Sequence, residues 1–431
     1  MNVFWHRRDL RIDDNAALYK ALKQSKDVQP IFIFDKNILD DLPKTDQRLI
    51  FLHQELEKLK DEYQSLNSDL WVFYGEPETI FNQLIIENEV DSVYTNRDYE
   101  PYAKERDKIV FTLLEKYNIS FVGAKDHVIF EKSEVLKDDD LPYRVFTPYM
   151  KKWKSVLKPF HLKSYPTKKY LKNLNHAKKA QTLIGLAKMG FADKKTVNFP
   201  SREINKDIIK NYHKTRDIPS IEGTSRLSLH LRFGTISIRK LAKIAQENEK
   251  YFNELIWRDF YQMIIYHFPH SIEQAFKPKY DNIEWENNTK LFKKWCEGKT
   301  GYPIVDAGMR ELNKTGFMHN RVRMVVASFL TKHLLIDWRW GEAYFAEKLL
   351  DFELASNVGG WQWAASSGVD AQPYFRVFNP ESQQKKFDNE FKYIKKWVPE
   401  YGTSDYPKQI VEHKSAREKA IEVYKVAVKG Q

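Results

Sequence analysis

Three side chains with useful chemistry occur at helical spacing in the stretch NELIWRD, residues 253–259. Glu254, Trp257 and Arg258 stand at i, i+3 and i+4, which places them on one face of a helix. That face combines a carboxyl group, a flat aromatic surface and a fixed positive charge, a set suited to an aromatic and polar ligand. A structural interpretation needs the same residues, with Trp257 in the core and Glu254 and Arg258 forming a surface ion pair worth about 0.3–0.5 kcal/mol.

The stretch NVGGWQW at residues 357–363 combines two adjacent glycines with two tryptophans. Each glycine weakens a helix by about 1 kcal/mol, so the pair indicates that something flat approaches the backbone closely. In a helix Asn357 and Trp361 face one way, whereas Trp363, about 200° from Trp361, faces another. One tryptophan could contact a cofactor and the other a second ligand. The alternative is a tight helix crossing lined by buried aromatic rings.

A third stretch, GTSRLSLHLRFG at residues 223–234, precedes a helix that we expect to begin at Ser237. Backbone N–H groups, hydroxyls and a guanidinium gathered at a helix start suit a pyrophosphate. A turn capped by serine and threonine would use the same residues.

Other polar clusters are weaker candidates for a site. His267 and His270 are separated by Pro269 and lack a carboxylate at ligand spacing, so we expect no metal site there. Asp351 and Glu353 stand two apart on a predicted helix and would point to different sides, which favours capping or ion pairing over a metal clamp.

Short apolar runs alternate with amphipathic stretches over the first 130 residues, which predicts a parallel sheet with helices on both faces. The expected strands are 3–5, 31–34, 70–74, 92–94 and 121–122, and the expected helices are 46–63, 78–88 and 101–117. Beyond residue 200 the pattern is mostly helical, with helices expected at 238–249, 252–267, 305–313, 320–335 and 342–354.

Composition narrows the class of protein. The chain has 431 residues, 42% of them hydrophobic, a formal net charge of +11 and one cysteine, Cys296. This composition excludes a disordered chain and a disulfide framework.

The N-terminus MNVFWHRRDL is too polar for a signal peptide, and no stretch reaches the roughly 18 apolar residues of a membrane span, so we expect a cytoplasmic protein. Residues 141–192 hold 12 Lys and Arg with no Asp or Glu, and they lack a helical or strand period, which favours a solvated connector.

Taken together, these motifs resemble those of the DNA photolyase/cryptochrome family nearly from end to end, most closely the class I photolyases that act on cyclobutane pyrimidine dimers. The resemblance runs through WHRRDLR at 5–11, the stretches at 223–234, 254–261, 298–313, 316–324, 337–341 and 357–380, and DYP at 405–407. It implies an N-terminal α/β, Rossmann-like antenna domain at 1–130, a connector at 131–199 and an all-α FAD-binding domain at 200–431. It also implies light-driven repair of DNA by a deoxyribodipyrimidine photo-lyase, a carbon–carbon lyase that uses reduced FAD.

The resemblance assigns roles residue by residue. FAD would be held by Tyr212, Thr224, Ser225, Arg226, Leu227, Ser228, Arg258, Arg323, Asp351, Glu353 and Asn357, with Arg323 paired to Asp351 and Asn357 at flavin N5. Damaged DNA would be bound by Glu254, Trp257, Arg321, Met324 and Trp363, and Asn320 would support Glu254. Trp361, Trp338 and Trp285 would relay electrons to the flavin, while Trp295 and Trp340 are interpreted as packing residues.

Several positions separate branches of the family. Asn320 and Met324 stand where (6-4) photolyases have histidines, and Asn357 stands where plant cryptochromes have aspartate, so the resemblance favours dimer repair over blue-light signalling through a partner. A flavin-free DNA-binding module would leave the tryptophan and glycine pattern unexplained. Leu229, Glu353 and Val358 depart from the common residues at their positions.

The antenna pigment is left open by the sequence. Ala103 lacks the carboxylate of the folate-binding type, so a deazaflavin, another pigment or no antenna are the alternatives. We expect a monomer that acts on ultraviolet-damaged DNA, associates with a bacterial-type nucleoid through that DNA, and binds neither a metal nor a membrane.

Overall fold

The computed structural model describes residues 1–176 and 180–429. The described chain divides into two compact units that are not continuous in sequence. Unit 1 comprises residues 1–131, 156–204 and 226–245, and unit 2 comprises residues 132–155, 205–225 and 246–431. Residues 177–179, at the end of the basic stretch, lie outside the description, as do 430–431. No helix among the described residues is long and apolar enough to cross a membrane.

Unit 1 is built on a five-stranded parallel sheet in the order β3-β2-β1-β4-β5. Its strands are β1 (Asn2–His6), β2 (Val28–Asp35), β3 (Trp71–Gly75), β4 (Ser92–Asn96) and β5 (Ser120–Ala124). Its α-helices are α1 (Ala16–Gln24), α2 (Lys36–Leu39), α3 (Gln47–Ser65), α4 (Pro77–Glu87), α5 (Pro101–Lys116), α8 (Ser228–Phe233) and α9 (Ile238–Ala245). All five strands and four of these helices, α3, α4, α5 and α9, were predicted from the sequence; α1, rich in buried alanine, was not.

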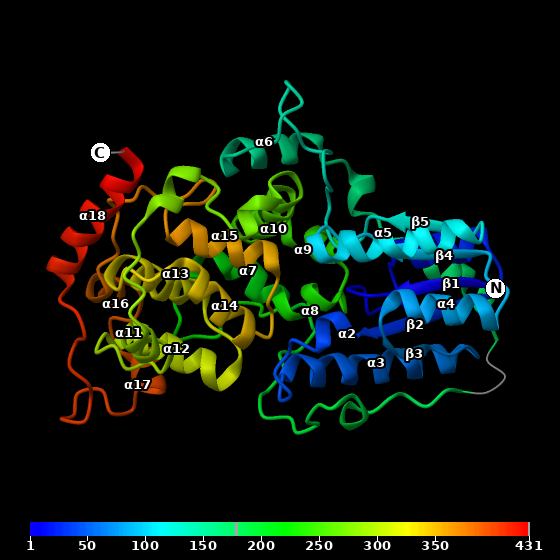
Figure 1. Ribbon diagram of the computed structural model, residues 1–431, viewed down its shortest axis with the longest axis horizontal. Helices are drawn as coiled ribbons and strands as arrows, with labels where there is room; N and C mark the ends of the chain where they lie inside the picture. Colours follow the sequence, from blue (N-terminus) through cyan, green and yellow to red (C-terminus); the bar gives the residue numbers. More distant parts are fainter. Residues whose placement is uncertain (177–179, 430–431) are drawn as a thin grey trace. The chain divides into compact units, whose positions relative to one another are not determined.

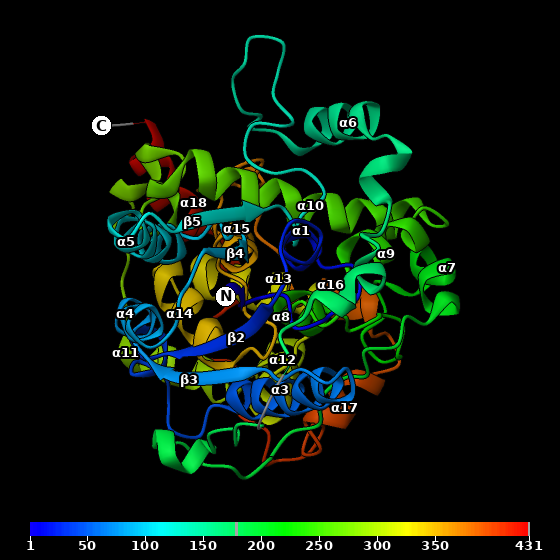
Figure 2. The ribbon, with the colours of Figure 1, turned by 90° about the vertical axis from the view of Figure 1, so that its right-hand side faces the viewer.

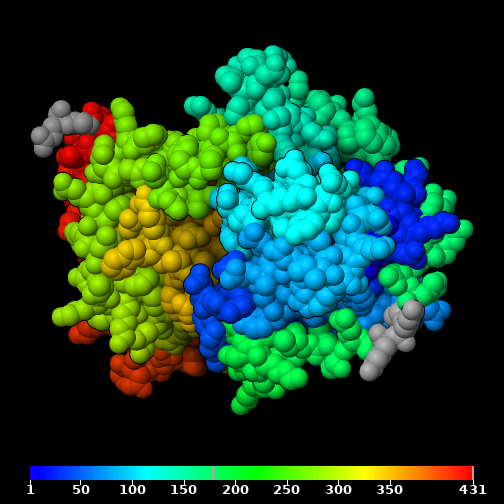
Figure 3. All heavy atoms as spheres, turned by 45° about the vertical axis from the view of Figure 1, so that its right-hand side comes forward, coloured from blue at the N-terminus to red at the C-terminus, as the bar shows by residue number. Residues whose placement is uncertain are grey.

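Successive side chains along β1 and β2 point to opposite faces of the sheet, and each face has its own hydrophobic core. Val3 and Ile31 pack with α4 and α5, whereas Phe4 and Phe32 pack with α1 and α3. Figure 2 shows α4 and α5 on one face of the strands and α1 and α3 on the other. In the space-filling view the blue and cyan segments containing α4 and α5 form the surface of unit 1 that faces the viewer (Figure 3).

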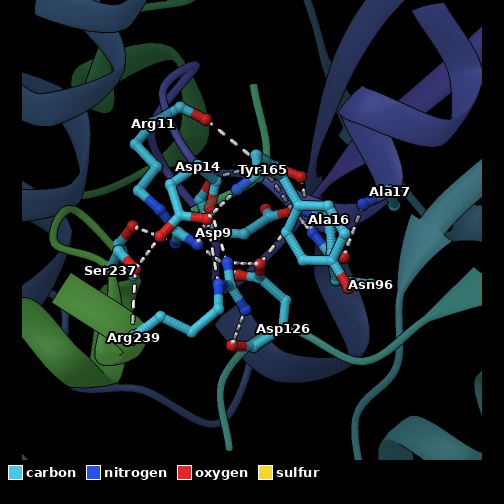
Figure 4. Close-up of polar contacts among 12 residues, drawn as sticks. Asp9, Arg11, Asp14, Ala16, Ala17, Asn96, Asp126, Tyr165, Ser237 and Arg239 are labelled. Atoms are coloured by element: carbon cyan, nitrogen blue, oxygen red, sulfur yellow. Dashed lines mark hydrogen bonds and ion pairs between the residues drawn. The ribbon is translucent and has the colours of Figure 1, made fainter. Parts of the chain in front are cut away.

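A buried ion network joins α9 to the segments that follow β1 and β5 (Figure 4). Asp126 accepts hydrogen bonds from Arg11 Nη2 at 2.6 Å and from Arg239 Nη2 at 2.8 Å, and Arg239 Nε donates to Asp14 at 2.9 Å. Burial alone would raise the pKa of Asp126, but the two guanidiniums lower it below its usual value. The carboxylate therefore stays charged in the interior, where its two arginines compensate it.

Unit 2 is helical, as the sequence predicts (Figure 1). Its helices are α6 (Phe146–Val156, whose last residue belongs to unit 1), α7 (Lys206–Thr215), α10 (Glu249–His267), α11 (Thr289–Cys296), α12 (Pro303–Thr315), α13 (Asn320–Ser328), α14 (Trp338–Lys348), α15 (Leu354–Ala364), α16 (Pro380–Phe387), α17 (Lys392–Trp397) and α18 (His413–Lys429). Its main core is formed by α11 to α15 with α17 and includes the buried rings of Trp295, Trp338 and Trp361.

Three helix predictions for the C-terminal half were wrong in extent. The helix expected at 238–249 ends at Ala245, and Asn248 caps the next one by accepting from the N–H groups of Lys250 and Tyr251. The helix expected at 320–335 gives way to a π-helical turn at Phe329–His333. The helix expected at 342–354 ends at Lys348, so residues 349–353 form a non-helical link.

The basic stretch also differs from the expected irregular connector. Residues 146–156 form α6, which buries Phe146, Tyr149 and Trp153 on one face. The spacing of these three aromatic residues, at i, i+3 and i+7, is a helical signal that the abundance of lysine obscured.

Candidate functional site

The link between α14 and α15 carries two carboxylates, Asp351 and Glu353, each of which pairs with an arginine of another helix. Arg323 Nη2 donates to both oxygens of Asp351, at 3.2 and 3.1 Å, and Arg258 Nη2 donates to Glu353 Oε1 at 2.8 Å. The expected pairing of Arg323 with Asp351 is confirmed. Asp351 and Glu353 each pair with a separate arginine, in agreement with the expectation of ion pairing at these two positions, although the link that carries them is not helical.

Glu254 is paired differently from the sequence interpretation. It accepts a hydrogen bond from Arg216 Nη1 rather than pairing with Arg258 on its own helix. Burial is the largest influence on its carboxyl group and raises the pKa of Glu254, although the charge of Arg216 opposes the shift. Arg258 is instead committed to Glu353, so the simple surface ion pair between Glu254 and Arg258 is wrong.

Arg216 extends this contact into a row of alternating charges. Its Nε lies 3.9 Å from Asp217 Oδ1, and the same carboxylate accepts from Arg321 Nη2 at 2.6 Å. The row therefore connects Glu254 on α10 with Arg321 on α13. Sequence reasoning missed Arg216 and Asp217, because they follow α7 in a turn and carry no periodic signal.

The first part of the glycine–serine stretch places its hydroxyl groups in unit 2. Ser225 Oγ lies 2.8 Å from the hydroxyl of Tyr251, whose ring packs edge-on against Tyr212 at 5.1 Å between centroids. Burial raises the pKa of Tyr212. Thr224 precedes this contact in the same loop.

The rest of that stretch belongs to unit 1. Arg226 has a left-handed backbone with φ 51°, buried Leu227 precedes α8, and Ser228 is its first residue. The helix expected to begin at Ser237 is α9, which begins at Ile238. A short helix that was not predicted, α8, begins at Ser228 inside the motif itself.

The glycine pair lies inside α15, as expected, but the two glycines have different surroundings. A Cβ built on Gly359 would stand 2.3 Å from ring carbons of Tyr261, whereas one built on Gly360 would meet nothing within 4 Å. The flat group close to the backbone is thus a side chain of α10 at Gly359, which confirms the tight-crossing alternative there. Gly360 leaves open space on the surface of the helix between Asn357 and Trp363.

Asn357 is held in a fixed orientation at one side of this open space. Its Nδ2 donates to Glu342 Oε1 at 2.8 Å and to the Glu342 carbonyl at 3.1 Å. Burial raises the pKa of Glu342, and its hydrogen bond with Asn357 opposes that shift. Glu342 was not identified from the sequence, since nothing in the pattern connects α14 with α15.

The expected relay tryptophans occupy the core and its edge. Trp361 and Trp338 are both buried, and Trp285 is half-buried against Tyr424 of α18 at 5.9 Å between centroids. Trp295 is completely buried, 6.0 Å from Trp361, and its Nε1 donates to the carbonyl of Val326 at 3.1 Å. Its satisfied N–H group and burial agree with the packing interpretation of Trp295.

The remaining expected DNA-binding residues lie partly exposed. Trp257 and Trp363 are half-buried, Asn320 is exposed as the first residue of α13, and Met324 contacts Arg321 through its sulfur at 3.7 Å. One face of Trp257 is covered by the ring of Phe146. Within the described residues, no cluster of three or more His, Cys, Asp and Glu side chains is arranged to hold a metal ion.

The donor set of unit 2 fits a flavin nucleotide. Arg258 and Arg323 offer guanidinium groups that Glu353 and Asp351 hold in place, Ser225 supplies a hydroxyl, Asn357 supplies a positioned amide, and Gly360 leaves room for a flat group above the helix.

Comparison with known proteins agrees with this arrangement. Residues 2–169 match the family model described as DNA photolyase, and residues 251–404 match the model described as FAD binding domain of DNA photolyase. A deoxyribodipyrimidine photo-lyase of Synechococcus is 36% identical over 95% of this chain and 93% of its own length. The protein therefore belongs to the DNA photolyase family and has its FAD-binding domain.

Solved structures support the same assignment. A bacterial class III photolyase from Agrobacterium tumefaciens has a TM-score of 0.88 at 32% identity, covering 99% of this chain and 98% of that one. An archaeal photolyase from Sulfolobus tokodaii, solved with two FAD molecules, has a TM-score of 0.86 at 36% identity, covering 99% and 100%. The predicted fold class, an α/β domain followed by a helical one, is confirmed.

Proposed function

We propose that this protein is a deoxyribodipyrimidine photo-lyase that uses light and reduced FAD to split cyclobutane pyrimidine dimers in DNA. The observation that carries the proposal is the surface of α15, where Asn357, the open space at Gly360 and Trp363 adjoin one another. A bound flavin supplies light absorption and the electron that opens the cyclobutane ring. The near full-length similarity to photo-lyases supports the same activity.

The roles of individual residues are part of the proposal. Tyr212, Thr224, Ser225, Arg226, Leu227, Ser228, Arg258, Arg323, Asp351, Glu353 and Asn357 bind FAD. The guanidinium of Arg258 would bind the phosphates of FAD, and Glu353 fixes its orientation through their ion pair. Asn357 presents a neutral amide that hydrogen-bonds the flavin without adding negative charge, which favours a reduced, anionic ring.

Glu254 donates a hydrogen bond to a carbonyl of the lesion, a contact that only its protonated form can make. The raised pKa of its half-buried carboxyl group supports this role, and Asn320 assists. Trp257 and Trp363 stack on the extruded bases, which typically contributes about 1–3 kcal/mol per base, while Arg321 and Met324 contact the DNA. Trp361, Trp338 and Trp285 return electrons to oxidised flavin.

Finer features of the proposal concern the setting of the enzyme. We infer that it acts as a monomer in the cytoplasm, associated with the nucleoid through damaged DNA. The class I assignment and the division at residues 130 and 199 stay predictions. A second, antenna pigment of folate, deazaflavin or another type is compatible with the proposal.

The activity is tested with irradiated oligothymidine. Purified protein loaded with FAD and chemically reduced should restore thymine absorbance at 260 nm under blue light and leave it unchanged in the dark. Glu254→Leu should lower the yield per absorbed photon about tenfold with flavin retained, whereas Glu254→Gln, which keeps a donor, should stay close to the wild type. Flavin-loaded protein that binds dimers without splitting them would refute the enzyme and favour a blue-light receptor.

A further inference from the structure

An aromatic ring from α6 is stacked on Trp257, the residue proposed above to contact the lesion. The centroids of Phe146 and Trp257 are 3.7 Å apart and their planes are inclined by only 6°. Phe146 is buried, whereas Trp257 is half-buried. One face of the indole is thus covered by the protein, and any base that stacks on Trp257 must use the opposite face.

Several contacts hold α6 against α10 independently of this stack. Tyr149 packs on Phe260 at 5.0 Å between centroids, and Trp153 Nε1 donates to Asp259 Oδ2 at 3.0 Å. Figures 1 and 2 both show α6 beside α10. The attachment of the helix therefore does not depend on the pair of rings alone.

The backbone at Phe146 is also anchored to the segment that follows α15. The N–H group of Phe146 donates to Asp370 Oδ2 at 3.1 Å, so the first residue of α6 is fixed at its backbone as well as at its ring. Two other rings of α10 approach Trp257, and neither is parallel to it: Phe260 lies edge-on at 5.6 Å and 78°, and Tyr261 is tilted at 5.4 Å and 35°. Parallel stacking on Phe146 is consequently the contact that defines the plane of the indole.

We propose that Phe146 is a positioning residue for lesion recognition, which fixes the plane of Trp257 so that its free face receives the extruded base. The inference rests on the proposed function. An indole already held in one orientation loses less conformational freedom when a base stacks on it. The α6 helix, within the stretch that its lysines suggested was a connector, then belongs to the recognition surface.

A double-mutant cycle tests this role, because it isolates the coupling between the two rings. The variants are Phe146→Leu, Trp257→Leu and the double mutant, each measured for binding to a dimer-containing oligonucleotide and to its undamaged counterpart. Phe146→Leu should weaken binding of the dimer about five- to tenfold, without changing binding of undamaged DNA. In the Trp257→Leu background the same substitution should change dimer binding less than twofold.

Two further variants separate positioning from a general effect on α6. Tyr149→Leu removes a buried ring of the same helix that contacts Phe260 and should leave the preference for the dimer unchanged. Phe146→Tyr keeps a stacking ring and should restore most of the preference. Flavin content and melting temperature confirm that each variant is folded.

The inference is overturned if Phe146→Leu keeps the wild-type preference, if Tyr149→Leu lowers it equally, or if Phe146→Leu has its full effect without Trp257. These outcomes differ from failure of the proposed function, in which the wild type itself would leave the dimer intact under blue light or would show no preference for it.

Discussion

Gly359 and Gly360 are neighbours in α15 with different surroundings, so replacing each by alanine should change the stability of the protein in opposite directions. Alanine is favoured over glycine inside a helix by about 1 kcal/mol. At Gly360 the added methyl group meets nothing within 4 Å, so Gly360→Ala should stabilise the flavin-free protein by about that amount. For a unit of this size the expected rise in melting temperature is about 2–4 °C.

Gly359→Ala is the matched control, with the opposite expectation. Its methyl group would stand 2.3 Å from the ring of Tyr261, so the two helices must move apart or the ring must rotate. Overpacking of this kind costs about 1–3 kcal/mol, which outweighs or cancels the gain in helix propensity. The expected result is a melting temperature equal to or several degrees below that of the wild type.

The two effects are measured by thermal unfolding of flavin-free protein, followed by flavin content and affinity for dimer-containing DNA. Because the space at Gly360 is proposed to receive a ligand, Gly360→Ala should bind FAD or the dimer at least tenfold more weakly despite its greater stability. A Gly360→Ala variant that is destabilised would show that the space is not open. One that is stabilised and binds both ligands normally would refute its use as a ligand surface.

Two other predictions concern the relay and the C-terminal helix. Trp338→Phe should slow photoreduction of oxidised flavin at least tenfold and should not change repair by chemically reduced enzyme. Trp340→Phe, the control, should change neither rate. Unchanged photoreduction in Trp338→Phe would show that Trp338 is not part of the relay. In the second prediction, His333 Nε2 and His413 Nδ1 are 2.9 Å apart, and burial lowers the pKa of His333 to about 3. Folding therefore favours the neutral form of His333. The resulting stability is fully present above the unfolded pKa of about 6.5 and is lost as the pH falls toward 3. At pH 5 the loss is about 2 kcal/mol. His333→Gln, whose side-chain amide extends as far as Nε2 and can still hydrogen-bond His413, should show a smaller drop in melting temperature between pH 7.5 and 5, and an identical drop would contradict this account.

Periodic patterns in the sequence predicted the sheet and most of its helices, because alternation and helical spacing are local properties. The pairing of Arg323 with Asp351 came from family resemblance and was correct. The partner of Glu254 could not be predicted, since Arg216 lies 38 residues away in a turn and only the fold brings the two together. Glu342 escaped notice for the same reason.

The high lysine content of residues 141–192 led to the prediction of an irregular connector, although aromatic residues at helical spacing occur within it. Phe146, Tyr149 and Trp153 carry the helical signal of α6, but the surrounding charges favoured a solvated connector. Conversely, the glycine pair was identified correctly as unusual, while its two members could be told apart only after Tyr261 was placed against one of them.

The ion network of unit 1 sets an order of events during synthesis of the protein. Asp126 leaves the ribosome 113 residues before Arg239, which corresponds to about 6–23 s at typical elongation rates. Throughout that interval Asp126 has only Arg11 as a cationic partner, and a buried carboxylate that lacks part of its compensation is costly. The nascent N-terminal sheet should therefore remain incompletely closed, and sensitive to proteases, until the polypeptide has been extended through α9.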